Sequence, residues 1–300
     1  MDACLTQQVE AMPELPDVAI LADALHAGLV GRPVVGADVV QPLVMRATSA
    51  ELAALEGQVL RSVRRRGKFL LFDLDRDRIV NNPMLTGRLG MAAPGQKPFK
   101  GTAFVLTLGP RDGRPHDAAS WTAAAAGIPA DDARVEKRYR DPTRMGKVYL
   151  VPAGVERAIP GWDGMGPDAD DPGLDLASWR ERIRKHRGEL KNMLKEQAFV
   201  AGIGNGYSDE ILWQARLAPL RKRSSLAADE VDALYRATRE VLPWAIAELR
   251  ERVPPHYEVE VRDFLRVHRK GGTPCPRCGA TISEISPGGF VTSWCRTCQR

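Results

Sequence analysis

The chain has 300 residues, of which 44% are hydrophobic and 27% are charged, a balance that is typical of globular proteins and allows two modest domains. No apolar stretch is long enough to span a membrane, and residues 1–11 lack the basic and apolar segments of a secretory signal. We therefore expect a cytoplasmic protein with no membrane partner. The net charge of +5 is too small by itself to indicate a polyanionic partner.

The first motif is Met-Pro-Glu-Leu-Pro at residues 12–16. If the chain were trimmed after Met12, Pro13 would carry a secondary amine that can attack an aldehyde carbon, with Glu14 beside it as a proton carrier. A free α-amino group has a pKa of about 8, so a useful fraction is unprotonated at neutral pH. The same prolines also favour a turn or an extended lead-in, and on this motif alone the turn is the favoured interpretation.

Short apolar runs bounded by glycine, proline or aspartate follow, and they indicate the strands of a β-sandwich. A helix is expected before them, because apolar residues recur at helical spacing in residues 16–29. The strands are expected at residues 34–40, 58–63, 68–74, 102–108 and 147–151. Residues 110–133 indicate a long loop.

The second half of the chain changes to helical periodicity after a segment rich in glycine, proline and aspartate at residues 160–173, which is typical of a linker. Helices are expected at residues 176–187, 190–200, 208–215 and 228–250. The predicted fold class is α+β, with an N-terminal β-sandwich and its leading helix, a helical domain and a small C-terminal metal domain.

Four cysteines close the chain, as Cys275 and Cys278 followed after sixteen residues by Cys295 and Cys298. Two such pairs have the spacing of a tetrahedral structural zinc site, and the ion would stabilise a short tail that has little core of its own. Disulfides and iron are the alternatives, but a cytoplasmic chain favours one structural Zn²⁺.

Basic residues are concentrated in the second half, at residues 180–195, 216–223 and 262–300, which favours a partner with a phosphate backbone. Arginines at 64, 65 and 66 precede Lys68 in a predicted hairpin, where the cations could project together or simply be solvated. The glycine-rich residues 200–207 lie between two predicted helices. Such a turn can present N–H groups to a phosphate with Asn205 as a side-chain donor, or it can be a plain interhelical turn.

The segment from Asn81 to Gly87 combines asparagines, a proline and the apolar Met84 and Leu85 in a predicted tight loop. Exposed apolar side chains at a loop tip can enter a base stack as a wedge. Packing against a neighbouring strand is the commoner explanation for such residues.

These motifs, in this order, resemble those of the formamidopyrimidine-DNA glycosylase and endonuclease VIII family from Met12 to Arg300. The resemblance rests on the Pro-Glu-Leu-Pro start, the Arg-Arg-Gly-Lys hairpin, the Gly202–Tyr207 turn with Glu210 behind it, and the four-cysteine finger. It implies an extension at 1–12, a catalytic sandwich at 13–160, a linker at 161–176, a helix-two-turns-helix DNA-binding domain at 177–262 and a zinc finger at 263–300.

The implied activity is base excision repair by a monomeric bifunctional glycosylase and abasic-site lyase, acting on double-stranded DNA with a damaged, oxidised base or an abasic site. The resemblance implies Pro13 as nucleophile through a Schiff base, Glu14 as acid and base, and Lys68 as a contact to the lesion phosphate. Further DNA contacts are expected from Met84, Leu85, Arg144, Lys191 and Asn205. The finger is expected to enter the minor groove after the damaged nucleotide flips out of the stack.

Four positions depart from the family pattern. Asp17 replaces a glutamate, Thr143 and Met145 stand where the wedge usually has an arginine and a phenylalanine, and Phe290 stands where a finger arginine usually grips the lesion phosphate. A phenylalanine cannot form that bidentate contact. A catalytically weak or inactive binder of damaged or abasic DNA therefore stays open as an alternative, above all if residues 1–11 remain attached, and a zinc-ribbon protein that binds RNA is a third hypothesis.

Overall fold

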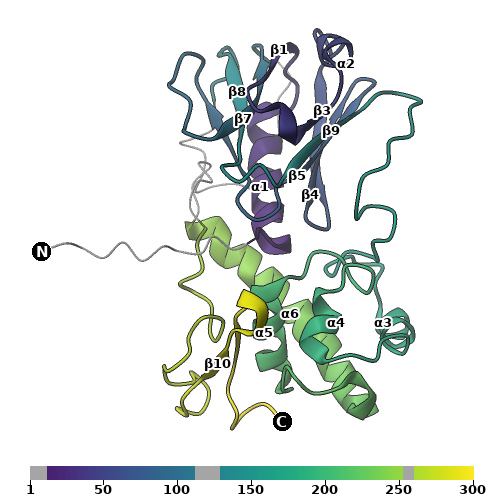
Figure 1. Ribbon diagram of the computed structural model, residues 1–300, viewed down its shortest axis with the longest axis vertical. Helices are drawn as coiled ribbons and strands as arrows, with labels where there is room; N and C mark the ends of the chain where they lie inside the picture. Colours follow the sequence, from purple (N-terminus) through teal and green to yellow (C-terminus); the bar gives the residue numbers. More distant parts are fainter. Residues whose placement is uncertain (1–11, 112–128, 253–259) are drawn as a thin grey trace, which may run out of the picture.

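The computed structural model describes residues 12–111, 129–252 and 260–300. The chain forms an upper lobe of two sheets around a helix and a lower lobe of helices and a small finger (Figure 1). The expected extension at residues 1–11 and the centre of the expected loop at 110–133 lie outside the described residues.

Helix α1 (Leu15–Leu29) leads the fold, as the helical periodicity of residues 16–29 predicts. Glu14 is its N-cap, Pro16 lies in the first turn, and the Asp17 carboxylate accepts a hydrogen bond of 2.8 Å from the Glu14 N–H. This is a capping box, and proline is favoured in the first turn because the N–H that it lacks would have no helical partner there.

Two sheets make the sandwich. The four-stranded sheet has the order β1 (Val34–Val39), β7 (Thr102–Leu108), β8 (Val135–Arg140), β6 (Arg88–Ala92). The five-stranded sheet has the order β2 (Met45–Arg46), β9 (Lys147–Val151), β5 (Arg78–Asn82), β4 (Phe69–Leu74), β3 (Leu60–Arg66). All neighbours pair antiparallel except β2 and β9. The short helix η1 (Pro42–Val44) connects β1 to β2 of the second sheet, and α2 (Ser49–Ala53) connects β2 to β3.

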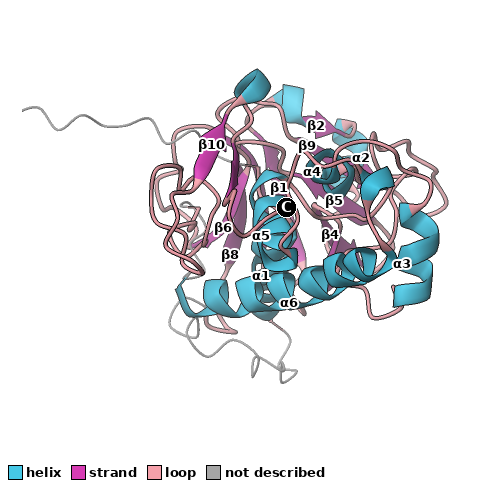
Figure 2. Ribbon diagram, turned by 90° about the horizontal axis from the view of Figure 1, so that it is seen from below, coloured by secondary structure: helices cyan, strands magenta, loops and turns pink. Residues whose placement is uncertain are grey.

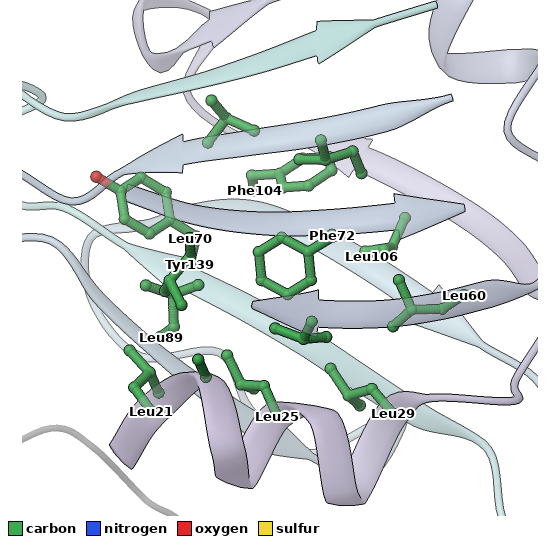
Figure 3. Packing of buried hydrophobic residues seen from close by; sticks show 14 of the residues in the cluster. Leu21, Leu25, Leu29, Leu60, Leu70, Phe72, Leu89, Phe104, Leu106 and Tyr139 are labelled. Atoms are coloured by element: carbon green, nitrogen blue, oxygen red, sulfur yellow. The ribbon is translucent and has the colours of Figure 1, made fainter. Parts of the chain in front are cut away.

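Apolar side chains from both sheets meet α1 in one continuous core. Leu21, Leu25 and Leu29 point from the helix toward Phe72 of one sheet and Phe104 of the other (Figure 3). Burying side chains of this size contributes about 1.5–3 kcal/mol each, so α1 is held by the sandwich and its first residues have a fixed position.

The prediction of a sandwich preceded by a helix is confirmed, with local differences. Strands β7 and β9 have the expected bounds, while β3 begins at Leu60 and continues through Arg66. Strands β2, β5, β6 and β8 and helix α2 lie outside the elements predicted from the sequence. Asn81 was expected in a loop, but it lies at the end of β5 with its side chain fully buried and its Nδ2 donating to the Lys147 carbonyl.

The segment between the lobes is fixed at both ends. Trp162 packs edge-on against Phe69 on the outer face of the five-stranded sheet, with 5.5 Å between ring centroids. Asp168 pairs by backbone with Ala201 of the helical lobe and accepts from the Gly67 N–H at 2.7 Å. This segment therefore contacts both lobes and holds them together.

The helical lobe contains α3 (Leu176–Ile183), α4 (Leu190–Lys195), α5 (Asn205–Ala215), η4 (Arg223–Ser225) and α6 (Ala228–Arg252). Helix α6 packs against both α1 and α5 (Figure 2). The expected helix at 190–200 ends at Lys195, because Glu196 is extended, and the helix expected from 208 begins at Asn205, because Gly204 acts as its N-cap.

The finger ends the chain with the hairpin β10 (Ser283–Ile285) and β11 (Thr292–Trp294), joined through η5 (Pro287–Gly289). It packs on α5 through Trp213, which lies against Val267, Ile282 and the buried cysteines. Among the described residues, no helix is long and apolar enough to cross a membrane.

Candidate functional site

Glu14 lies where the two lobes meet, and its side chain is 2% exposed. Its carboxylate accepts backbone N–H groups from Gly204 at 2.6 Å, Gly206 at 2.7 Å and Tyr207 at 3.3 Å. These donors form the N-terminus of α5, where the helix dipole and unpaired N–H groups favour a negative charge. The helical lobe thus fixes the carboxylate that adjoins Pro13.

The glycines of the turn make room for this contact. A Cβ added to Gly204 would lie 2.5 Å from the Glu14 Cδ, and one added to Gly202, which has a φ of +102°, would lie 2.6 Å from a Leu15 methyl carbon. The sequence left two interpretations of this turn open, N–H groups that bind a DNA phosphate or a plain interhelical turn. The N–H groups of Gly204 and Gly206 bind the protein's own Glu14 carboxylate.

Pro13 is buried beside Glu14 and lines a small, mostly apolar pocket between α1 and the turn that follows β5. Ile20, Leu89 and Val261 are among its walls. Pro13 therefore borders this pocket, together with Asp17 and Leu89.

Asp17 completes the lining with an ion pair. Its carboxylate lies 2.6 Å from the Arg262 Nη2, and the Arg262 guanidinium stacks 4.8 Å from the Tyr207 ring centroid. Burial raises the pKa of Asp17 to about 6, although Arg262 acts in the opposite direction. Sequence reasoning missed Arg262 and Tyr207, and the aspartate at position 17 fits here because it both caps α1 and reaches Arg262.

Lys68 reaches the same junction from the β3–β4 turn. Its Nζ lies 3.9 Å from the Met12 Sδ, so Lys68 and the residue before Pro13 are neighbours. Burial lowers the pKa of Lys68, while the carboxylate of Glu14 raises it. The structure therefore brings Pro13, Glu14 and Lys68 to one place, the junction of the lobes.

The three arginines before Lys68 pair with carboxylates, so the interpretation in which their cations project together is wrong. Arg65 pairs with Asp168 at 3.0 Å and Asp170 at 2.7 Å, and Arg66 pairs with Asp168 at 3.1 Å. Arg64 pairs with Asp73. Arg65 and Arg66 thus share the Asp168 carboxylate of the segment between the lobes, while Arg64 pairs within the hairpin.

Asn205 and Lys191 both contact the finger. Asn205 Nδ2 and Lys191 Nζ donate to the Val291 carbonyl at 2.8 and 2.7 Å, and Lys191 also pairs with Asp209 at 2.7 Å. Lys191 is 3% exposed. Its ammonium is engaged inside the protein, which gives no support to its expected contact with DNA.

Met84, Leu85 and Arg144 lie on two adjacent turns. Thr86 of the first turn and Thr143 of the second both donate to the Asp141 Oδ1, at 2.5 and 3.0 Å. Met84 and Arg144 have φ values of +50° and +59°, a region that costs energy for residues with a Cβ. The structure thus assembles the expected wedge residues, with Met145 44% exposed beside them.

The four cysteines converge as the spacing predicts. Their sulfur atoms all lie within 4.8 Å of one another, with Cys275 and Cys298 at 4.0 Å and Cys278 and Cys295 at 3.6 Å. A tetrahedral ion with Zn–S bonds of about 2.3 Å needs sulfur separations of about 3.8 Å. The donor set fits one structural zinc, held by Cys275, Cys278, Cys295 and Cys298.

Three family models match successive parts of the chain. They are the formamidopyrimidine-DNA glycosylase N-terminal domain at residues 12–148, the formamidopyrimidine-DNA glycosylase H2TH domain at 165–253 and the zinc finger found in FPG and IleRS at 272–300. The chain belongs to the formamidopyrimidine-DNA glycosylase family.

Relatives from this family align with almost the whole of this chain and of their own length. The formamidopyrimidine-DNA glycosylase of Thermomicrobium roseum is 33% identical over 96% of this chain and 99% of its own, and that of Pelotomaculum thermopropionicum is 29% identical over the same shares. A solved complex between the Lactococcus lactis Fpg and DNA containing an abasic site aligns with a TM-score of 0.79 and 25% identity, over 96% of this chain and 99% of that one.

Proposed function

We propose that this protein is a DNA-repair glycosylase and abasic-site lyase that uses the secondary amine of Pro13. The observation that carries the proposal is the geometry of Glu14. Three backbone N–H groups of the other lobe hold its carboxylate, so the adjoining Pro13 lies at the junction beside Lys68. A nucleophile with an acid and base beside it is the arrangement that covalent catalysis requires.

The chemistry follows from a free Pro13 nitrogen. The nitrogen lone pair attacks C1′ of the damaged nucleotide, and the base leaves with the electron pair of the C1′–N bond and a proton. The Pro13 nitrogen then gives up its own proton, the C1′–O4′ bond breaks as O4′ takes a proton, and the nitrogen lone pair forms the C1′=N⁺ bond of an iminium cation. This cation acidifies C2′–H; when a base removes that proton, the C3′–O bond breaks and the 3′ phosphate leaves. Glu14 holds or returns the protons of these steps.

The remaining contacts of the site orient the DNA. Lys68 pairs with the phosphate beside the flipped nucleotide, and Met84, Leu85 and Arg144 fill the gap left in the stack. Asn205 orients the finger through Val291, and the zinc ion keeps the finger folded. The partner is double-stranded DNA with a damaged base or an abasic site, bound by one copy of the chain, and the protein acts in the cytoplasm.

Borohydride trapping on duplex DNA with one abasic site tests this function. Zinc-loaded protein that begins at Pro13 after removal of Met12 is expected to form a covalent adduct, because borohydride reduces the iminium to a stable amine. The Pro13→Gly variant carries a primary amine in place of the secondary amine, in a looser position, and is expected to give far less adduct. Absence of any adduct from the correctly processed protein would overturn the enzyme proposal.

A second function follows if residues before Pro13 stay attached. The Pro13 nitrogen is then an amide, and Met12 keeps its thioether 3.9 Å from the Lys68 ammonium. Such a protein would bind damaged DNA without cutting it. Salt-dependent binding to abasic duplex with no strand product after long incubation would identify this form.

A further inference from the structure

Phe290 is an exposed aromatic residue at the tip of the finger. It follows η5, where Gly288 and Gly289 have φ values of +61° and +83°, and its side chain is 58% exposed. Exposing a ring of this size to water is unfavourable, so a contact that covers the ring, from this protein or from a bound molecule, would be stabilising. The next residue, Val291, is fixed by the hydrogen bonds from Lys191 and Asn205.

Lys195 is the cation that Phe290 meets. Its Nζ lies 5.2 Å from the Phe290 ring centroid, within the range of a cation–π contact. Lys195 follows Lys191 by four residues, so the two lysines lie on the same face of α4. One turn of helix thus directs Lys191 to the backbone of the finger tip and Lys195 to its ring.

The two lysines differ in what neutralises them. Lys191 has the Asp209 carboxylate at 2.7 Å, whereas Lys195 has no ion pair among the residues that the structure describes. The side chain of Lys195 is half-buried. Among the described residues, no carboxylate therefore neutralises the ammonium of Lys195.

Lys195 also lies close to the residues around Glu14. The Gln197 Nε2 donates to the carbonyls of Lys195 at 2.8 Å and Ile203 at 2.9 Å, and the Gln197 Oε1 accepts from the Gly202 N–H at 2.9 Å, so the end of α4 is tied to the glycine turn that holds Glu14. The charge of Lys195 also lowers the pKa of Lys68. The nearby carboxylates of Glu14 and Asp17 are already bound by the α5 N-terminus and by Arg262. Like charges brought together beside engaged carboxylates favour an external anion between them.

We propose that Lys195, supported on the ring of Phe290, is a phosphate-binding residue of this protein and grips the strand next to the Lys68 phosphate. This rests on the proposed function. Phe290 holds the ammonium from one side by its π face and leaves the other side open to a phosphate oxygen. An ammonium is a point charge without the fixed fork of a guanidinium, so the contact demands charge at that place and little geometric precision.

Binding to duplex DNA that carries one tetrahydrofuran abasic analogue tests the assignment without requiring catalysis. The full zinc-loaded chain with Lys195→Met is expected to bind about 5- to 20-fold more weakly, and the slope of log Kd against log salt is expected to fall by about one. The matched control is Lys97→Met, because Lys97 is exposed between β6 and β7 and lies outside the three basic segments of the second half of the chain. It is expected to change the Kd less than twofold.

Two further variants test the role of the ring. Phe290→Leu removes the π face but keeps an apolar side chain, so it should weaken binding by about 2- to 5-fold and add little to Lys195→Met. Phe290→Arg in the Lys195→Met background should restore most of the affinity and the salt slope. Zinc content and the thermal midpoint of each variant check folding, and Lys195→Gln replaces Lys195→Met if that variant is unstable.

The outcomes separate the two proposals. Wild-type affinity and salt slope in Lys195→Met overturn the phosphate contact, as does a loss confined to Phe290→Leu, which would mean that the ring itself stacks on a nucleotide. Either result leaves borohydride trapping by Pro13 intact. Loss of trapping in a protein whose Kd still depends on Lys195 would overturn the enzyme and keep the contact.

Discussion

The junction between the lobes and the interior of the sandwich each bury a charged side chain. The first is hydrogen-bonded and the second is not. Glu14 is 2% exposed and receives three backbone N–H groups. Lys137 of β8 is fully buried, and among the described residues its Nζ has no hydrogen-bond partner. The rings of Phe72 and Phe104 face it, at 4.6 and 5.1 Å from the ammonium to the centroids.

The difference follows from the groups that surround each charge, which are hydrogen-bond donors at the junction and apolar side chains in the sandwich. A helix N-terminus supplies unpaired donors, so the junction accepts a carboxylate at little cost. The interior of two packed sheets supplies apolar surface, and desolvation lowers the pKa of Lys137 to about 7. The compensated charge lies beside the proposed nucleophile, while the uncompensated one lies away from it in the sandwich core.

The largest effect is expected from Glu14→Gln. The amide keeps the volume but removes the proton carrier, so abasic-strand cleavage should fall by about 100-fold or more. One amide nitrogen would also face N–H donors, which should lower stability by about 1–3 kcal/mol. Single-turnover cleavage and thermal unfolding measure the two effects, with Glu181→Gln as an exposed control. Wild-type cleavage by Glu14→Gln would exclude Glu14 from the reaction.

A smaller effect is expected from Gly204→Ala. The added methyl would meet the Glu14 carboxylate at 2.5 Å and displace it, so cleavage should fall by about 10- to 100-fold. Gly90→Ala is the matched control, because a Cβ there has no heavy atom within 4 Å. Equal cleavage by the two variants would mean that the placement of Glu14 by α5 does not matter.

The smallest effect on activity, and a clear effect on stability, is expected from Lys137→Met. The folded pKa of about 7 lies below the ordinary value of 10.5, so the destabilisation by the charged lysine is complete below pH 7 and fades as the pH rises toward 10.5. The stability advantage of Lys137→Met should therefore shrink by about 2 kcal/mol between pH 7 and pH 9. Urea unfolding at both pH values measures this. A pH-independent difference would contradict an uncompensated charge.

The sequence predicted the local chemistry better than the contacts across the chain. The cysteine spacing and the Met-Pro-Glu start identify their residues directly, and the apolar periodicity of residues 16–29 predicts α1. The partners of Glu14, however, lie 190 or more positions away in the chain. No local pattern shows that the glycine turn binds a carboxylate of the protein itself.

Charge runs were the least informative signal. Arg65 and Arg66 belong to a basic segment, yet both are paired with Asp168, 103 and 102 positions away, and Lys191 is paired with Asp209 of the next helix. Strand β8 was missed because its sequence, Val-Glu-Lys-Arg-Tyr-Arg, is mostly polar, although Lys137 and Tyr139 turn into the core. Burial of a lysine contradicts the usual preference of that residue for water, so only the structure reveals it.

Identification of the trapped residue tests the central claim most directly. After borohydride reduction on abasic duplex, the protein would be digested and the modified peptide sequenced by mass spectrometry. We predict that the reduced sugar is carried by the Pro13 nitrogen of chains that begin at Pro13, and that chains retaining Met12 carry none. A sugar on the Nζ of Lys68 or Lys195, or equal trapping by chains that retain Met12, would contradict the account.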